Sequence, residues 1–220
     1  GNSMLDKVRY FREHFDQVRS LLVLEPRGHA GMFAGVLTDP CAEGADAGVI
    51  FCNPGGYDTM CGHGTIAICT VLIESGMVQA TEPVTRILLD TPAGVVEGSV
   101  EVDTGLAHLV TLRNVASFLY DADVDVNVPG LGTVQLDIAY GGDLFYAIVD
   151  AETVDIVLEP EVDARIIAVG RKIWEAVSKQ IQVRHPEIPA LMGFAGVIFS
   201  GPPSHPEATL KNACFGPPGF

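Results

Sequence analysis

The stretch Gly55-Gly56-Tyr57-Asp58-Thr59-Met60-Cys61-Gly62-His63-Gly64-Thr65 leads directly into the apolar segment Ile66 to Ile73, which stops at Gly76. Its glycines and Asp58 are typical of a turn, and the apolar run behind them predicts a buried helix. The sequence therefore places a cysteine, Cys61, at the start of a core helix.

This arrangement suits a chemical site. Gly62 and Gly64 let the backbone approach a ligand closely, and the first N–H groups of a helix form a ready anion site, for example for a carboxylate. The same helix end favours the thiolate of Cys61, the form that acts as a base or nucleophile. The alternative is a buried helix whose cysteine packs as a small hydrophobe, and the motif taken alone favours that alternative.

Composition narrows the function. The chain has 220 residues, of which 48% are hydrophobic, enough for one large domain or two small ones. A net charge of -15 argues against a nucleic-acid partner. We expect no membrane partner, because no apolar run reaches about 18 residues, and no signal peptide, because the N-terminus lacks the charged and apolar regions of one. Five sparse cysteines without zinc-like spacing predict a reducing compartment, hence a cytoplasmic protein, and no metal site.

The pattern of elements indicates an α+β protein. Apolar spacing predicts helices over 4–23 and 163–183, and two strands, 31–37 and 47–51, flank an acidic loop. Short segments rich in Val, Leu and Thr predict six further strands, joined by tight turns as in an antiparallel sheet or barrel. These strands are expected at 84–89, 94–102, 107–112, 124–128, 132–139 and 144–149.

An internal repeat predicts two similar domains. Residues 194–198, Phe-Ala-Gly-Val-Ile, nearly duplicate residues 33–37, Phe-Ala-Gly-Val-Leu, and both copies follow an amphipathic helix. Both copies then lead into a second strand, which ends in Phe51 in the first copy and Phe215 in the second. Such a duplication points to two domains, expected at 1–120 and 121–220.

The string Met60-Cys61-Gly62-His63-Gly64-Thr65-Ile66, supported by residues 25–29 and 141–146, resembles the proline racemase family. That family comprises proline racemases, hydroxyproline epimerases and trans-3-hydroxyproline dehydratases. The resemblance implies a fold of the diaminopimelate epimerase type, with two pseudo-symmetric domains. Each is a barrel-like, mostly antiparallel sheet around a central helix. Family members use no cofactor and are often homodimers.

The implied reaction removes and returns the α-proton of a small-molecule substrate, proline or hydroxyproline. By resemblance Cys61 is one acid/base, while Gly62, His63 and Gly64 hold the substrate carboxylate and imino nitrogen. Dehydration of trans-3-hydroxy-L-proline is one alternative, and a non-catalytic fragment that keeps only the binding fold is another. Two other classes of the same fold fit the motif less well. A diaminopimelate epimerase typically has Asn where His63 stands, and the phenazine-type isomerases lack the cysteine.

The resemblance also implies segments outside these residues. Family members carry a strand before the segment that Gly1 to Met4 resembles. They also carry a second motif, Pro-Cys-Gly-Thr-Gly, which follows a segment like Asn212 to Phe220. The second acid/base residue is therefore expected beyond Phe220. His29 is interpreted as a loop histidine that bonds the backbone, and Phe145 with Tyr146 as core packing.

Overall fold

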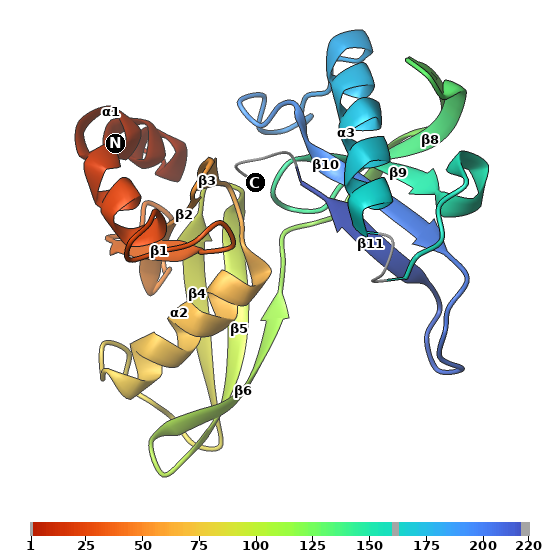
Figure 1. Cartoon of the computed structure of the whole chain (residues 1–220). Coiled ribbons are helices and arrows are strands. Elements are labelled where there is room, and N and C mark those ends of the chain that lie inside the picture. The colour runs from red at the N-terminus through yellow and green to blue at the C-terminus, as the bar shows by residue number, and fades with distance from the viewer. Residues whose placement is uncertain (1, 160–162, 217–220) are drawn as a thin grey trace. The chain divides into compact units, whose positions relative to one another are not determined.

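The computed structural model describes residues 2–159 and 163–216. Contacts divide the chain into two compact units, the first ending at Ala116 and the second beginning at Ser117. Each unit combines helices with one mixed sheet, so the chain is an α+β protein (Figure 1).

The first unit holds a six-stranded sheet whose main path runs β1-β2-β4-β5-β6, with the short β3 paired to β2 (Figure 1). All neighbours pair antiparallel except β2 and β4, which are parallel. The elements are α1 (Met4–Val23), β1 (Ala34–Thr38), β2 (Ala47–Asn53), β3 (Gly56–Asp58), α2 (Gly62–Glu74), β4 (Val84–Thr91), β5 (Gly94–Asp103) and β6 (Leu106–Arg113).

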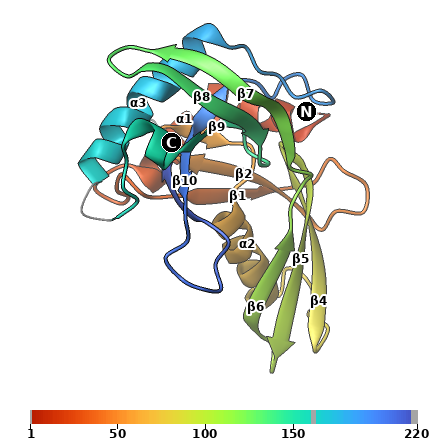
Figure 2. The same ribbon diagram turned by 90° about the vertical axis from the view of Figure 1, so that its right-hand side faces the viewer.

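Helix α2 buries one side in the core of this unit. It packs against β5 and against β1 and β6, the two ends of the strand path, which favours a sheet that curls around the helix (Figure 2). Its residues Cys69 and Leu72 are 0% and 3% exposed and share one apolar cluster with Phe51, Ile87 and Val100. The apolar segment of the sequence therefore forms the expected helix, but only one side of it is buried, because Ile66 and Val71 are 40% and 49% exposed.

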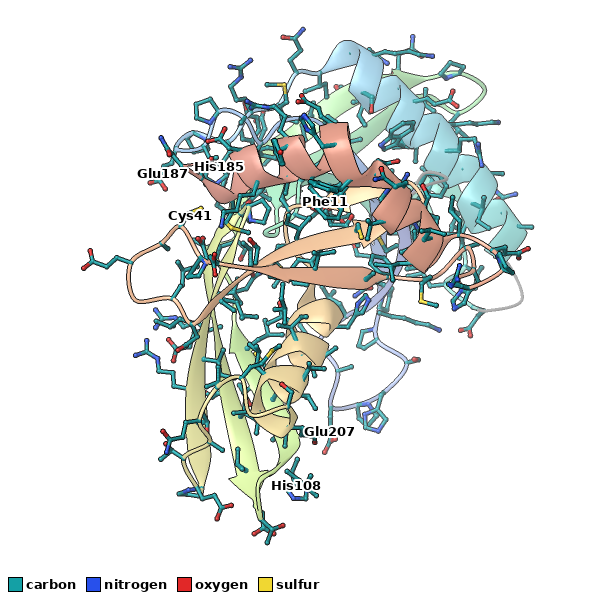
Figure 3. All side chains as sticks on the ribbon, turned by 90° about the vertical axis from the view of Figure 1, so that its left-hand side faces the viewer. Phe11, Cys41, His108, His185, Glu187 and Glu207 are labelled. Carbon is teal, nitrogen blue, oxygen red and sulfur yellow. The ribbon has the colours of Figure 1, made fainter. Side chains whose placement is uncertain are left out.

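Helix α1 has the bounds expected from its amphipathic spacing, and Ser3 caps it by accepting a hydrogen bond from the Asp6 N–H at 3.1 Å. Its apolar side packs on β2, where Phe11 joins Met4, Val8 and Ile50 (Figure 3). Strand β1 begins three residues later than expected, because the chain before it forms a turn between the Met32 N–H and the His29 carbonyl.

The second unit holds a five-stranded sheet in the order β11-β10-β9-β8-β7, with β9 and β10 parallel and the other pairs antiparallel. The domain boundary expected after residue 120 falls within β7. Helix α3 packs against β10 and against both ends of the strand order, β7 and β11. The elements are β7 (Phe118–Val128), β8 (Gly132–Tyr140), β9 (Phe145–Asp150), the 3-10 turn η1 (Ala151–Val154), α3 (Asp163–Gln180), β10 (Phe194–Gly201) and β11 (Lys211–Phe215).

The two copies of the repeat form antiparallel hairpins whose registers define their correspondence. Val36 lies opposite Ile50 in the first hairpin, and Val197 lies opposite Phe215 in the second. Ile50 packs on α1, and Phe215 packs on α3. Phe215 therefore corresponds to Ile50 and not, as the sequence comparison suggested, to Phe51.

Two fold predictions have different outcomes. The mostly antiparallel character holds, with one parallel pair in each unit. A barrel around a central helix, of the diaminopimelate epimerase type, stays a prediction. Among the described residues, no helix combines the length and apolar character needed to span a membrane.

Candidate active site

Cys61 is the N-cap residue of α2, with extended backbone angles (φ -140°, ψ 115°). Its side chain makes no capping hydrogen bond, so the sulfur is not used to begin the helix. Its carbonyl accepts the Thr65 N–H and the Thr65 hydroxyl, both at 2.9 Å. The first turn is therefore held through the main chain, while the Cys61 side chain packs in the apolar cluster that contains Phe51 and Ile68.

The amides that follow Cys61 have no hydrogen-bond partner among the residues that the structure describes. Within the described part of the chain, no hydrogen bond engages the main-chain N–H groups of Gly62, His63 or Gly64. A Cβ atom at Gly62 would meet no heavy atom within 4 Å, so space lies beside this helix end. The first turn carries no acidic residue, and its positive dipole end favours an anion such as a carboxylate.

His63 lies next to the thiol. The Cys61 Sγ atom is 3.7 Å from His63 Nδ1 and 3.6 Å from Nε2, and His63 is exposed while Cys61 is 7% exposed. The Phe33 ring meets the His63 ring edge-on at a centroid distance of 4.8 Å. Phe33 was not expected as a neighbour of the site, although the residue opens the repeated segment.

Two other cysteines are poor candidates for the chemistry. Burial raises the pKa of Cys52 to about 11 and that of Cys69 to about 11. Both thiols therefore stay protonated at neutral pH, and both lie in the core, whereas Cys41 and Cys214 are exposed. No disulfide joins cysteines within the described residues.

Histidines elsewhere stabilise turns. The Nδ1 atoms of His29, His185 and His205 each accept a main-chain N–H two residues further along the chain, at 3.1 to 3.2 Å. His185 is buried, and Figure 3 labels it next to Glu187, whose N–H it accepts. The loop role expected for His29 is confirmed. Phe145 is fully buried among Phe118, Tyr120 and Tyr140, as expected of a core residue.

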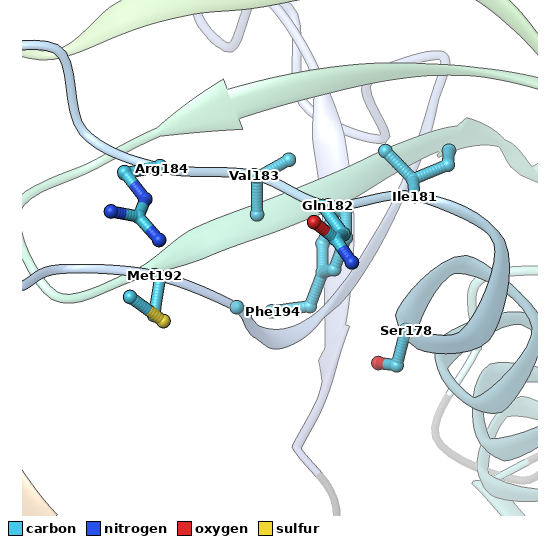
Figure 4. A pocket seen from close by; sticks show the side chains of 8 residues that line it. Ser178, Ile181, Gln182, Val183, Arg184, Met192 and Phe194 are labelled. Atoms are coloured by element: carbon cyan, nitrogen blue, oxygen red, sulfur yellow. The ribbon is translucent and has the colours of Figure 1, made fainter. Parts of the chain in front are cut away.

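A separate cavity of about 470 Å³ lies in the second unit, where α3 ends and β10 begins (Figure 4). Apolar side chains, including Val183, Met192 and Phe194, and the cation Arg184 line it. These residues offer no acid/base pair, so we do not assign the chemistry to this cavity. Across residues 2–159 and 163–216, no group of three or more potential metal ligands comes together.

Comparison with known proteins identifies the family. The sequence profile of the proline racemase family matches residues 1–219, so the chain belongs to that family. It is 42% identical over 212 residues to a proline racemase of Clostridioides difficile, covering 96% of this chain and 63% of that protein. It is 40% identical over 214 residues to a trans-3-hydroxy-L-proline dehydratase of Azospirillum brasilense, covering 97% of this chain and 64% of that protein.

A solved structure agrees with the same assignment. The hydroxyproline epimerase of Agrobacterium vitis, determined with bound trans-4-hydroxy-L-proline, superposes with a TM-score of 0.89 at 32% sequence identity. The match covers 100% of this chain and 63% of that one. The present chain thus spans a little under two thirds of the length of the relatives it matches.

Proposed function

We propose that the chain is part of a cofactor-independent racemase or epimerase acting on proline or hydroxyproline. Cys61 takes or returns the α-proton, and Gly62, His63 and Gly64 hold the substrate carboxylate. The observation that carries the proposal is the set of N–H groups at the start of α2, next to Cys61, that no residue within 2–159 or 163–216 engages. We also propose that the protein has the diaminopimelate epimerase type of fold, with a barrel-like sheet around each central helix.

The chemistry follows from charge. An α-proton beside a carboxylate is weakly acidic, and its removal moves negative charge onto the carboxylate oxygens. N–H groups already aimed at those oxygens stabilise the charge without reorganising, and the helix dipole adds to the effect. The His63 ring, 3.6 Å from the sulfur, is close enough to exchange a hydrogen bond with the thiolate.

Inversion needs a second group that donates a proton from the opposite face, because one base alone returns the proton to the face it left. We assign no described residue to that role. With a second cysteine the complete protein inverts the α-carbon. With a threonine there it expels a 3-hydroxyl group instead, as the resemblance to the family implies.

Dehydration is the second candidate, because relatives with the two activities are almost equally similar, at 42% and 40% identity. The two reactions differ in their products. Inversion of L-proline gives D-proline with no change in mass. Loss of water from trans-3-hydroxy-L-proline gives an unsaturated imino acid, which a reductant traps as proline.

The test incubates the protein from its complete reading frame with L-proline, trans-4-hydroxy-L-proline and trans-3-hydroxy-L-proline separately. Chiral chromatography and mass spectrometry then follow inversion and loss of water. Inversion that disappears in Cys61→Ser supports the proposal. Loss of water alone selects the dehydratase, and no product from any of the three substrates selects the non-catalytic fold.

A further inference from the structure

The turn that delivers Cys61 is built around a buried polar pair. Asn53 and Asp58 are 2% and 6% exposed, and the Asn53 Nδ2 donates to both Asp58 carboxylate oxygens at 2.8 and 3.0 Å. The Asn53 Oδ1 accepts the N–H groups of Gly55 and Gly56 at 2.7 and 3.1 Å. One amide side chain therefore closes the turn and holds the strand that leaves it.

Helix α1 fastens the same turn from outside. The Arg19 guanidinium donates to the main-chain carbonyls of Asn53 and Pro54 at 3.0 and 2.9 Å. Asp16 holds that guanidinium at 2.7 and 3.0 Å and also accepts the Tyr57 hydroxyl at 2.8 Å. The turn and the strand that leaves it are thus both fixed to α1 before the chain reaches the thiol.

The short connection to Cys61 is anchored as well. The Ala93 N–H donates to the Thr59 carbonyl at 3.2 Å, and Met60 packs against Ala93 and Val96. From Asp58 to Cys61 there are only three peptide steps, so a displaced Asp58 displaces the sulfur. A buried carboxylate that loses its amide partner would be costly, which gives the pair a single geometry.

We propose that Asn53 and Asp58 are positioning residues that set the place of the Cys61 sulfur relative to the open amides of α2. They act through the turn and not by touching the substrate. The inference deepens the proposed function and rests on it for its catalytic meaning, while its effect on the thiol is measurable independently. A misplacement of about 1 Å is sufficient to lower a rate by up to about a hundredfold.

The experiment compares the variants Asp58→Asn and Asn53→Ser with a matched control, Asp90→Asn. Asp90 is also 6% exposed and also accepts two hydrogen bonds, in its case from the main-chain N–H groups of Cys41 and Ala42, but it serves a different loop. The first readout is the rate of Cys61 alkylation by iodoacetamide from about pH 5 to about pH 10, with thermal unfolding as a check on folding. The second is kcat and KM for α-proton exchange in the complete protein.

The direction in which the midpoint of the alkylation profile moves separates two explanations of how the pair acts. If the pair positions the sulfur, both variants move the thiolate away from the helix end, and the midpoint of the alkylation profile rises in both. If Asp58 acted by charge alone, its removal would lower the midpoint, and Asn53→Ser would leave it unchanged. We expect the midpoint to rise in both, with kcat falling about tenfold or more and KM changing little.

Several outcomes overturn the inference. These are a lowered midpoint in Asp58→Asn, an equal change in Asp90→Asn, unchanged kcat in both variants, and the failure of both variants to fold. The last would make the pair a folding determinant only. If the wild-type protein exchanges no α-proton, the proposed function fails, and the alkylation profile still decides whether the pair positions the thiol.

Discussion

A Cβ atom on Gly64 would lie 2.8 Å from Cε1 of Phe51 and 3.1 Å from Sγ of Cys61. Gly64 is therefore a contact residue as well as a flexible one, because only a hydrogen fits between the helix and the ring. Gly62, two residues earlier, has open space where a side chain would stand. The two glycines of the motif differ in their physical role.

We predict that Gly64→Ala destabilises the protein and that Gly62→Ala does not. The added methyl at residue 64 must displace the Phe51 ring within a packed core, at a cost of about 1–3 kcal/mol. For a chain of this size that lowers Tm by about 2–4 °C per kcal/mol. Thermal unfolding of the two variants measures the difference, and equal Tm values would contradict the packing described.

The contact between Gly98 and Cys69 predicts an energetic coupling. A Cβ at Gly98 would lie 2.5 Å from the Cys69 Sγ atom but 3.7 Å from its Cβ. Gly98→Ala should therefore destabilise the wild type and do so much less in a Cys69→Ala background, where the sulfur is gone. A double-mutant cycle from denaturant unfolding should give a coupling of about 1 kcal/mol or more. Additive effects would show that α2 does not pack on β5 as described.

The cysteines should differ in reactivity. Because burial raises the pKa of Cys52 and Cys69 to about 11, the thiolate fraction of each at pH 8 is only about one in a thousand. Mass spectrometry after brief treatment with iodoacetamide should find these two unlabelled in the folded protein, whereas the exposed Cys41 is labelled. Rapid labelling of Cys52 or Cys69 without unfolding would refute their placement in the core.

Alkaline pH should weaken the first unit through Tyr57. Burial, together with the hydrogen bond to Asp16, raises the pKa of this phenol from 10.0 to about 12. The folded state then binds the proton more tightly than the unfolded state, so the stabilisation is complete below about pH 10 and is lost as pH rises towards about 12. Tyr57→Phe should remove part of that loss. Denaturant unfolding at several pH values tests the prediction, and an identical pH dependence in Tyr57→Phe would contradict it.

The sequence predicted the elements well where a periodic pattern had a clear end. Helix α1 matches its expected bounds because its apolar spacing stops before Pro26 and Gly28, which interrupt helices. The motif around Cys61 also identified the family, because its residue types are specific in that order. Strand β3 was not expected, because three residues are too few to show an alternation.

Contacts between distant residues were beyond the reach of the sequence. Phe33 reaches His63 only because β1 and the start of α2 belong to one unit, and no local pattern signals that contact. The pairing of Asn53 with Asp58 depends on a turn geometry in which one side-chain amide makes four hydrogen bonds. The sequence comparison aligned Phe215 with Phe51, one residue away from its structural counterpart Ile50. Both Ile50 and Phe51 are apolar, so only the strand register shows which of them corresponds to Phe215.

The central claim is that the Cys61 sulfur moves the α-proton. Its most direct test is deuterium incorporation at the α-carbon of L-proline and of trans-4-hydroxy-L-proline in heavy water, followed by proton NMR with the complete protein. The account predicts exchange by the wild type and by Cys69→Ser, and a loss of at least about a hundredfold in Cys61→Ser. Exchange by Cys61→Ser at the wild-type rate would contradict it.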